Sequence, residues 1–254
     1  MNINEQKISD VLDKFASKLK ISDDIYDEIR SRRDKIIEFV KEFSRQQNLK
    51  IVGEFNLGSY KIRTGVKYHD NDFDIDYGIV LEEGTELSDA IRFKEKLIPW
   101  IREKLNNYYK LNVTVKDKKP VVTIKFMNNL NKPNFHIDFV IYVKPKINSI
   151  SFYKNDELLH LRRTSDNNSS YELKISDPKA TFNRQSKALD ESNGKNSKRN
   201  AILILKHLFS RNHLRGITSI YITDLVISLR DDDTFNLIKK FLYESSWRSS
   251  FNLK

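Results

Sequence analysis

The sequence lacks cysteine altogether, and it lacks any apolar run long enough to cross a membrane. With no cysteine among its 254 residues, the chain has no disulfide framework, no thiolate nucleophile and no zinc finger built on thiolates. No stretch of about 18 apolar residues occurs, so we expect no transmembrane helix. The first 15 residues carry charges throughout and contain no apolar core, which argues against a signal peptide. These absences favour a cytoplasmic protein that does not act at a membrane.

Positive charge is in surplus, with 45 lysines and arginines against 35 aspartates and glutamates. The formal net charge of +10 suits polyanionic partners such as nucleic acid, nucleotides or phosphate-rich products. Because lysine is common along the whole chain, part of this surplus serves only to keep the surface solvated. The charge therefore admits nucleic acid as a partner without requiring it, and the sequence does not indicate the oligomeric state.

The pair Gly58-Ser59 follows a short apolar run at 51–55 and begins a segment without strand alternation. At a corner between a strand and a helix, glycine followed by a hydroxyl residue lets backbone N–H groups approach a phosphate closely. Such a pair on its own is more often a simple turn, so the phosphate interpretation needs a second feature beside it.

The second feature is a set of aspartates, Asp72, Asp74 and Asp76, that alternates with apolar residues. A strand has a period of two, so all three carboxylates point to one face. Like charges repel at such positions, and aspartate is depleted in strands, so a divalent cation is the simplest neutralising partner. The alternative is a solvated strand edge. Of the two Asp-x-Asp pairs we favour Asp74 with Asp76, because the apolar strand 77–81 follows directly.

Together these motifs resemble those of the DNA polymerase β-like nucleotidyltransferases, in which Gly-Ser begins a short helix and Asp-x-Asp lies on the next strand. Within that superfamily, Gly58-Ser59-Tyr60 and Asp74-Ile75-Asp76-Tyr77-Gly78 are most similar to the bacterial CD-NTases, relatives of cyclic GMP-AMP synthase and oligoadenylate synthases. The resemblance implies magnesium-dependent synthesis of a cyclic or linear oligonucleotide second messenger from nucleoside triphosphates, often in antiphage defence.

A further acid, Asp138, lies in an apolar stretch at 135–142. Its immediate neighbours face the core, so the carboxylate points to the opposite side of the predicted strand. A lone aspartate there is locally inconsistent, which often marks function, although a satisfied buried aspartate is the alternative. The resemblance identifies Asp138 as the third metal ligand. We interpret His136 as a neighbour of the site, since magnesium prefers oxygen ligands.

The predicted helix 198–211 carries Arg199 and Lys206, which are seven residues apart and share the face opposite its apolar arc. A solvated helix face is the usual explanation of such a pair. The resemblance implies another role for Lys206, because CD-NTases carry a lysine in a similar apolar helix, where it touches the donor triphosphate.

We therefore expect an α+β fold, with a mixed-sheet, palm-like nucleotidyltransferase core, an N-terminal spine helix and a C-terminal helical lobe. The predicted domains are 1–165, the core with the N-terminal helices, and 166–254, the helical lobe that closes the active-site cleft. The expected elements are helices over 4–47 with a break near 21–24, a helix over 88–109 kinked or broken at Pro99, strands at 111–116, 122–126 and 135–142, a hairpin near 152–161, and helices that begin at 177–178, 198 and 231–233.

The resemblance also assigns roles. Two Mg²⁺ ions, or Mn²⁺ in their place, would be held by the predicted catalytic and metal-binding residues, and three further residues would bind the nucleotide. Two rival hypotheses remain: a nucleotidyltransferase that modifies an RNA 3′ end or a macromolecular, toxin-type target, and a non-catalytic nucleotide-binding relative. The intact acids count against the last. The predicted ligands of metal are Asp74, Asp76 and Asp138, and those of nucleotide are Gly58, Ser59 and Lys206.

Overall fold

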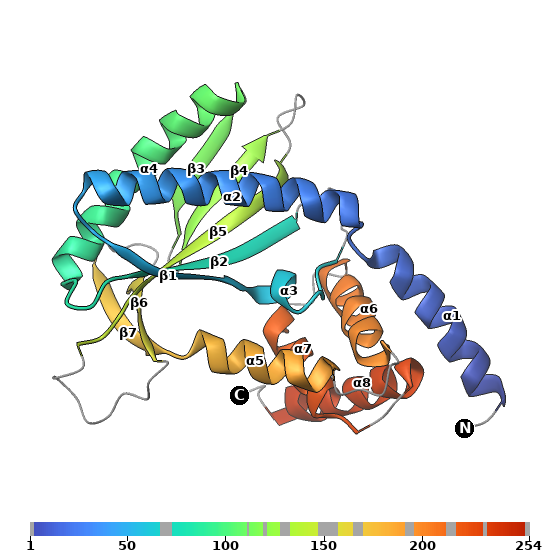
Figure 1. Cartoon of the computed structure of the whole chain (residues 1–254). Coiled ribbons are helices and arrows are strands. Elements are labelled where there is room, and N and C mark those ends of the chain that lie inside the picture. The colour runs from blue at the N-terminus through green and yellow to red at the C-terminus, as the bar shows by residue number, and fades with distance from the viewer. Residues whose placement is uncertain are drawn as a thin grey trace. The chain divides into compact units, whose positions relative to one another are not determined.

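The computed structural model describes residues 3–66, 73–110, 112–118, 121–127, 133–146, 157–164, 170–190, 196–211, 217–230 and 233–251. Its elements confirm the predicted α+β class, with N-terminal helices, a mixed sheet and a helical C-terminal part (Figure 1). In chain order they are α1 (Ile3–Leu19), α2 (Asp23–Gln46), β1 (Ile51–Leu57), α3 (Gly58–Lys61), β2 (Phe73–Leu81), α4 (Leu87–Tyr109), β3 (Val113–Asp117), β4 (Val122–Met127), β5 (Pro133–Val143), β6 (Leu158–Arg163), β7 (Tyr171–Ser176), α5 (Pro178–Asp190), α6 (Ser197–Arg211), α7 (Ser219–Ser228) and α8 (Thr234–Phe251).

The sheet has seven strands, and its central pair is parallel. The strand order is β1-β2-β5-β4-β3, with β2 parallel to β5 and the other neighbours antiparallel. The end of β5 pairs with β6 at residues 142–143, beyond the last residue paired with β4, and β7 pairs in turn with β6. The helix α4 and the hairpin of β3 and β4 separate β2 from β5 in the sequence, as a parallel pair requires a long connection.

Contacts divide the chain into two compact units, and the first, which we call the sheet unit, comprises 22–61 and 69–181. Within it, α2 and α4 cover one face of the sheet (Figure 1). Both helices are amphipathic, and their apolar stripes pack together; the rings of Phe43 and Phe93 lie 5.4 Å apart between centroids. The odd-numbered residues at 75–81 of β2 and 137–143 of β5, such as Ile75 and Ile137, are buried. Burial of that face fixes the strand register, so the even-numbered residues occupy the other face.

The second unit, which we call the helical unit, comprises 1–21, 62–68 and 182–254. Its described part is built around α6, whose residues 201–205 are all buried. A helix that is apolar all round must be covered on several sides, and α1, α7 and α8 each pack against α6. Helices α5 and α8 begin as the sequence predicts: Asp177 accepts a hydrogen bond from the backbone N–H of Ala180, and Asp233 accepts one from that of Asn236, each at 2.9 Å.

These units do not follow the predicted division at 165/166. The strand β7 lies beyond that point, yet it pairs with β6 in the sheet. Conversely, α1 and the segment 62–68 belong with the C-terminal helices, because Ala16, Leu19 and Val66 contribute to the helical core. Which segments fold independently is a separate question, so the division at 165/166 stays a prediction.

Two local predictions differ in part from the structure. Of the predicted kink or break at Pro99, the break does not occur, because α4 continues through the proline. Leu97 and Ile101 are buried on either side of it, and this packing outweighs one missing hydrogen bond; the kink stays a prediction. In place of the hairpin predicted near 152–161, the structure pairs β6 with β7 farther along the chain. Residues 152–156 of that prediction lie outside the described residues.

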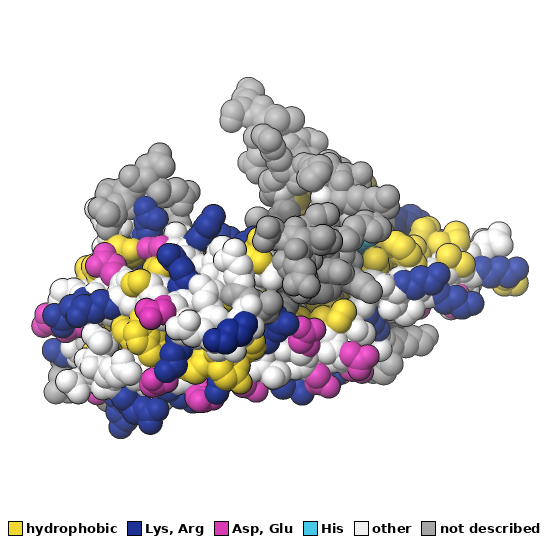
Figure 2. All heavy atoms as spheres, turned by 90° about the horizontal axis from the view of Figure 1, so that it is seen from above, with side chains coloured by type: hydrophobic (Ala, Val, Ile, Leu, Met, Phe, Trp, Pro, Cys, Tyr) yellow, Lys and Arg dark blue, Asp and Glu magenta, His cyan; other side chains and the backbone are white. Residues whose placement is uncertain are grey.

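Charges of both signs are interspersed along α2. The helix carries ion pairs at helical spacing between Arg30 and Asp27, Arg32 and Glu28, and Lys35 and Glu38. On the face of the molecule seen in Figure 2, basic and acidic side chains alternate with small apolar areas. On that face the surplus positive charge is therefore not gathered into one basic patch. No helix among the described residues has the length and apolar character needed to span a membrane.

Candidate active site

Two of the predicted acids lie side by side on the central strands. Asp76 of β2 and Asp138 of β5 are register partners in the parallel pair, and neighbours in register share a face of the sheet. That face is the one opposite the buried Ile75 and Ile137. The structure thus brings together two carboxylates that are 62 residues apart in the sequence.

The third predicted acid, Asp74, is the register partner of His136, and the structure describes only its backbone. By strand parity it lies on the same face as Asp76. Within the described residues, no group of three acidic or histidine side chains is placed to hold a metal ion. Asp72, the alternative partner of Asp74, lies outside the described residues, so the choice between the two Asp-x-Asp pairs stays a prediction.

Gly58 lies directly against Asp76. It follows the last residue of β1, has a positive φ of 60° and begins α3. A Cβ at this position would come within 2.9 Å of Asp76 Cγ, and the carboxylate oxygen Oδ2 would be closer still. Only glycine tolerates both the backbone angle and this approach. The predicted strand-to-helix corner is therefore present, and it brings the backbone of the Gly-Ser pair against a predicted metal ligand.

The short helix α3 is fixed against α2 by aromatic and cationic contacts. The ring of Tyr60 packs on Tyr26 with 5.5 Å between centroids. The guanidinium of Arg33 lies 5.6 Å from the centre of the Tyr60 ring, and it donates a hydrogen bond of 2.7 Å to Asn56 at the end of β1. These contacts hold α3, and Ser59 within it, in place, although α3 itself has only four residues.

Two buried polar atoms on the acid-bearing face have no hydrogen-bond partner: Asp138 Oδ1 and Thr123 Oγ1. Thr123 lies on β4, directly opposite Asp138 in register. Unsatisfied buried oxygen atoms are rare in folded proteins and call for an explanation. A divalent cation needs anionic oxygen ligands, and a carboxylate oxygen without a partner beside a second carboxylate fits this need.

No pattern in the sequence marks Thr123 as a functional residue. It alternates with Val122 and Ile124, and threonine is an ordinary strand residue. Only the pairing of β4 with β5 shows that its hydroxyl lies beside an acid.

The negative charge of Asp76 also acts on Tyr142, which lies farther along the sheet. Burial raises the pKa of the Tyr142 phenol above its ordinary value, and the negative charge of Asp76 raises that pKa further. The Tyr142 ring packs on Phe55 with 5.5 Å between centroids, and Gly78 between the two strands leaves room for both rings. An aromatic layer therefore borders the acids on the side toward β6.

Lys206 lies in the helical unit, where its ammonium group donates hydrogen bonds to Thr64. The distances are 3.2 Å to the backbone oxygen and 3.1 Å to Oγ1, and the residue is only 5% exposed. Lys206 therefore does not lie on a solvated face of the helix. Arg199 acts on the same segment, with its guanidinium 3.5 Å from the backbone oxygen of Ile62 and 2.5 Å from Asp190. Both cations thus hold the residues that follow α3, and the predicted contact of Lys206 with a triphosphate stays a prediction.

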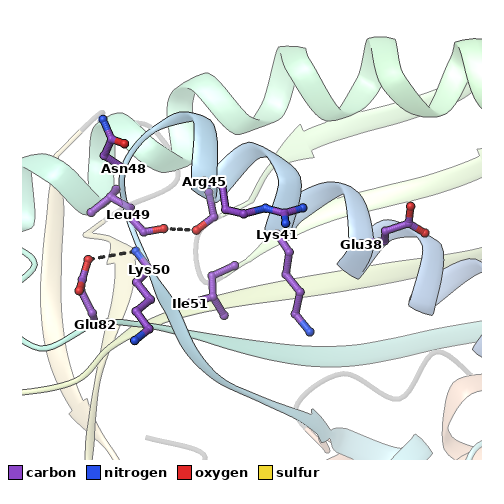
Figure 3. Close-up of a pocket in the computed structure, with 9 residues that line it drawn as sticks. Glu38, Lys41, Arg45, Asn48, Leu49, Lys50, Ile51 and Glu82 are labelled. Carbon is purple, nitrogen blue, oxygen red and sulfur yellow. Dashed lines mark hydrogen bonds between the residues drawn. The ribbon is translucent and has the colours of Figure 1, made fainter.

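A pocket of about 490 Å³ lies elsewhere in the sheet unit, at the C-terminal end of α2 (Figure 3). Lys41, Arg45 and Lys50 line it together with Glu38 and Glu82, and the backbone N–H of Lys50 donates to Glu82 at 3.0 Å. None of the residues that line this pocket is one of the predicted site residues.

One known family matches the stretch of the chain that contains the predicted site residues. Residues 54–142 match a family described as cyclic GMP-AMP synthase DncV-like, nucleotidyltransferase domain. The match begins in β1 and ends in β5, and it includes Gly58, Ser59 and all three predicted acids. No curated protein matches the sequence.

Several solved structures share the fold. Escherichia coli DncV in its 3′-deoxy GTP bound form is 17% identical with a TM-score of 0.67, and the match covers 90% of this chain and 75% of that one. CdnC of E. coli MS115-1, solved with ATP, is 14% identical with a TM-score of 0.63, over 93% of this chain and 71% of that one. The STING-associated CdnE c-di-GMP synthase of Capnocytophaga granulosa is 17% identical with a TM-score of 0.55, over 83% and 61%.

At these identities the structural likeness shows the fold alone, while the family match covers the stretch that carries the motifs. Both agree with the resemblance that Gly58-Ser59 and the Asp-x-Asp pattern predict, and with the prediction of a nucleotidyltransferase. The chain carries a DncV-like nucleotidyltransferase domain at residues 54–142.

Proposed function

We propose that this protein is a magnesium-dependent nucleotidyltransferase that joins nucleoside triphosphates into a cyclic or linear oligonucleotide second messenger in antiphage signalling. The observation that carries the proposal is the pairing of Asp76 with Asp138 on adjacent parallel strands, with Gly58 packed against Asp76. Structural relatives support it, since Vibrio cholerae DncV has been solved with a linear intermediate, pppApG, and CdnC with ATP.

The residues present fit a divalent cation. Asp138 Oδ1 is buried and has no hydrogen-bond partner, and its strand neighbour Asp76 offers a second carboxylate on the same face. Asp74, two residues before Asp76, would supply the third. When bound, a pair of such ions stabilises the attacking and leaving oxygens of a phosphoryl group.

In the proposed reaction a ribose hydroxyl oxygen attacks the α-phosphorus of a triphosphate. A new P–O ester bond forms, the bond to the β-phosphate bridging oxygen breaks, and pyrophosphate leaves while the hydroxyl proton is released. The chain's own residues bind and orient. The backbone at Gly58 and the Ser59 hydroxyl would bind the terminal phosphates. Asp74 and Asp76 would orient the triphosphate, and Asp138 would position the attacking hydroxyl.

Lys206 would add positive charge to the donor triphosphate. Its burial and its bonds to Thr64 hold the ammonium group in place, and a cation with a fixed position and little hydration acts strongly on a phosphate. This role is part of the proposal.

One alternative has an observation in its favour. Lys116 and Lys125 lie on the acid-bearing face of the sheet, because Lys125 pairs with His136 and Lys116 pairs with Thr123. Positive charge on this face toward the edge strand β3 suits the phosphates of a longer acceptor, such as an RNA 3′ end. A non-catalytic relative, the other alternative, would have no use for two unsatisfied oxygens beside an acid pair.

The deciding experiment incubates the purified protein with all four labelled nucleoside triphosphates and Mg²⁺, first alone and then with RNA. Phosphatase-resistant or linear oligonucleotides formed without RNA support the proposal. Label that appears only on RNA supports the alternative. No transfer in either case, with Asp76→Asn indistinguishable from wild type, would overturn both.

A further inference from the structure

A polar row crosses the sheet at the level of the acid pair. It runs from Asp76 on β2 to Asp138 on β5, then to Thr123 on β4 and Lys116 on β3, each the register partner of the one before. Register partners share a face, so these four side chains stand beside one another. Thr123 is the one uncharged member of the row, and it separates the acid pair from a lysine.

Thr123 is 1% exposed, and its hydroxyl has no hydrogen-bond partner. The same is true of the Oδ1 atom of Asp138 beside it. Valine would fill the position with the same shape and without an unsatisfied oxygen, as Val122 does next to it. An unpaired buried hydroxyl beside an unpaired buried carboxylate oxygen destabilises the fold, which is the signature of groups arranged for another purpose.

The donor and acceptor chemistry of the row gives the hydroxyl one partner. A threonine hydroxyl donates one hydrogen bond and accepts others, a carboxylate only accepts, and a lysine only donates. The hydroxyl proton can therefore go to Asp138 and not to Lys116. Side chains directly opposite each other on antiparallel strands have Cβ atoms about 4.5–5.5 Å apart, so rotation of Thr123 brings the hydroxyl within reach of Oδ1.

We propose that Thr123 is a positioning residue for Asp138. Its hydroxyl donates to Oδ1 when the other carboxylate oxygen binds a divalent cation, and so it fixes the orientation of that ligand. The inference rests on the proposed function, in which Asp138 holds such a cation. Residues that orient a metal ligand typically change metal affinity about 10–100-fold when they are replaced.

The test is a direct measurement of metal binding. Mn²⁺ is titrated into the protein in the presence of α,β-methylene ATP, and the Mn²⁺ concentration that gives half of the rise in melting temperature is recorded. Thr123→Val keeps the shape and removes the hydroxyl, while Thr123→Ser keeps the hydroxyl. Thr114→Val is the matched control, because Thr114 lies on the same face of β3, opposite Lys125 and away from the acids.

We expect Thr123→Val to raise the half-effect concentration tenfold or more, with Thr123→Ser and Thr114→Val within about twofold of wild type. Without metal, Thr123→Val should melt at or above the wild-type temperature, since it removes an unsatisfied hydroxyl. Equal Mn²⁺ binding by Thr123→Val and wild type would overturn the inference. A lower melting temperature for Thr123→Val than for Thr114→Val would also overturn it, because the hydroxyl would then have a structural partner.

Asp138→Asn separates this inference from the proposed function. If wild type and Asp138→Asn respond equally to Mn²⁺, the acid pair is not the metal site and the proposed function fails. If Asp138→Asn loses the response while Thr123→Val keeps it, only the role of Thr123 fails. A Thr123→Val variant that does not fold would overturn the inference in the same way as a lower melting temperature.

Discussion

Replacing Gly58 by alanine tests whether the Gly-Ser corner and the acids form one site. The substitution has two costs that the structure separates. The first is the positive φ of 60°, which costs a non-glycine residue about 1–2 kcal/mol. The second is steric: the added Cβ would lie 2.9 Å from Asp76 Cγ and closer to its carboxylate oxygen. Distances below 3.0 Å are essentially never seen for a Cβ, so the carboxylate or the corner must shift by roughly 1 Å, and a misplacement of that size can cost on the order of 100-fold in rate.

Gly84→Ala is the matched control for the backbone cost. Gly84 also has a positive φ, of 86°, but its Cβ would meet the flexible end of Lys146 at 3.1 Å and no carboxylate. Both variants should therefore lose the backbone contribution in a denaturant titration, and Gly58→Ala should lose more stability because it also meets Asp76. Only Gly58→Ala should lose nucleotidyl transfer, about 100-fold in kcat. If Gly58→Ala retains wild-type turnover at unchanged Mg²⁺, the contact with Asp76 is not part of a catalytic arrangement and our interpretation of the corner is wrong.

Three further predictions address the acids, the buried cation and the response to pH. Asp76→Asn should keep the melting temperature within a few degrees and abolish transfer, because a metal site loses an anionic ligand; a folded variant with near-wild-type activity contradicts the assignment. Lys206→Ala should weaken triphosphate binding roughly tenfold, and by more than Arg199→Ala, as measured by equilibrium titration beside melting temperatures; unchanged affinity would leave Lys206 an anchor of Thr64 only. The pKa of Tyr142 is raised chiefly by burial, so the phenol stays protonated in the folded state while the unfolded chain ionises near pH 10. The stability that this provides is complete below pH 10 and is lost as pH rises. Above pH 10, Tyr142→Phe should therefore reduce the fall of the free energy of unfolding with pH by up to about 1.4 kcal/mol per pH unit. If alkaline denaturation gives the same pH dependence for Tyr142→Phe and wild type, the raised pKa is refuted.

The sequence predicted the sheet well where one face is apolar. The alternation around Asp76 and Asp138 predicts which side chains are buried, and Ile75 and Ile137 are indeed at the core. Periodicity within each strand does not state which strand pairs with which, because pairing depends on packing between distant segments. The neighbourhood of the two acids was implied by the family resemblance, and the register that makes them direct partners came only from the structure.

Contacts between distant segments explain the other differences. Lys206 lies opposite the apolar arc of its helix in the sequence pattern, yet it is buried. Its partner Thr64 is 142 residues away, and no local pattern indicates that contact. The sequence of α1 does not indicate which unit this helix joins, and the packing of Ala16 and Leu19 places it in the helical one. The strand β7 has no apolar run that would predict a strand. It pairs with β6 through backbone hydrogen bonds, which the side-chain pattern does not reveal.

Three local departures from what stability alone favours lie in one small region. Gly58 adopts a positive φ with no room for a Cβ, and Asp138 and Thr123 each leave a buried oxygen unpaired. An unsatisfied buried polar group costs about 1–3 kcal/mol, so the two oxygens together offset a sizeable part of the 5–15 kcal/mol that typically stabilises a domain. In most proteins such departures are avoided by a residue that fits the local structure better. Here all three occur at Asp76 and its neighbours. Their coincidence favours the proposed site on physical grounds that do not depend on the family match, and it predicts that stability and activity will respond in opposite directions when Thr123 loses its hydroxyl.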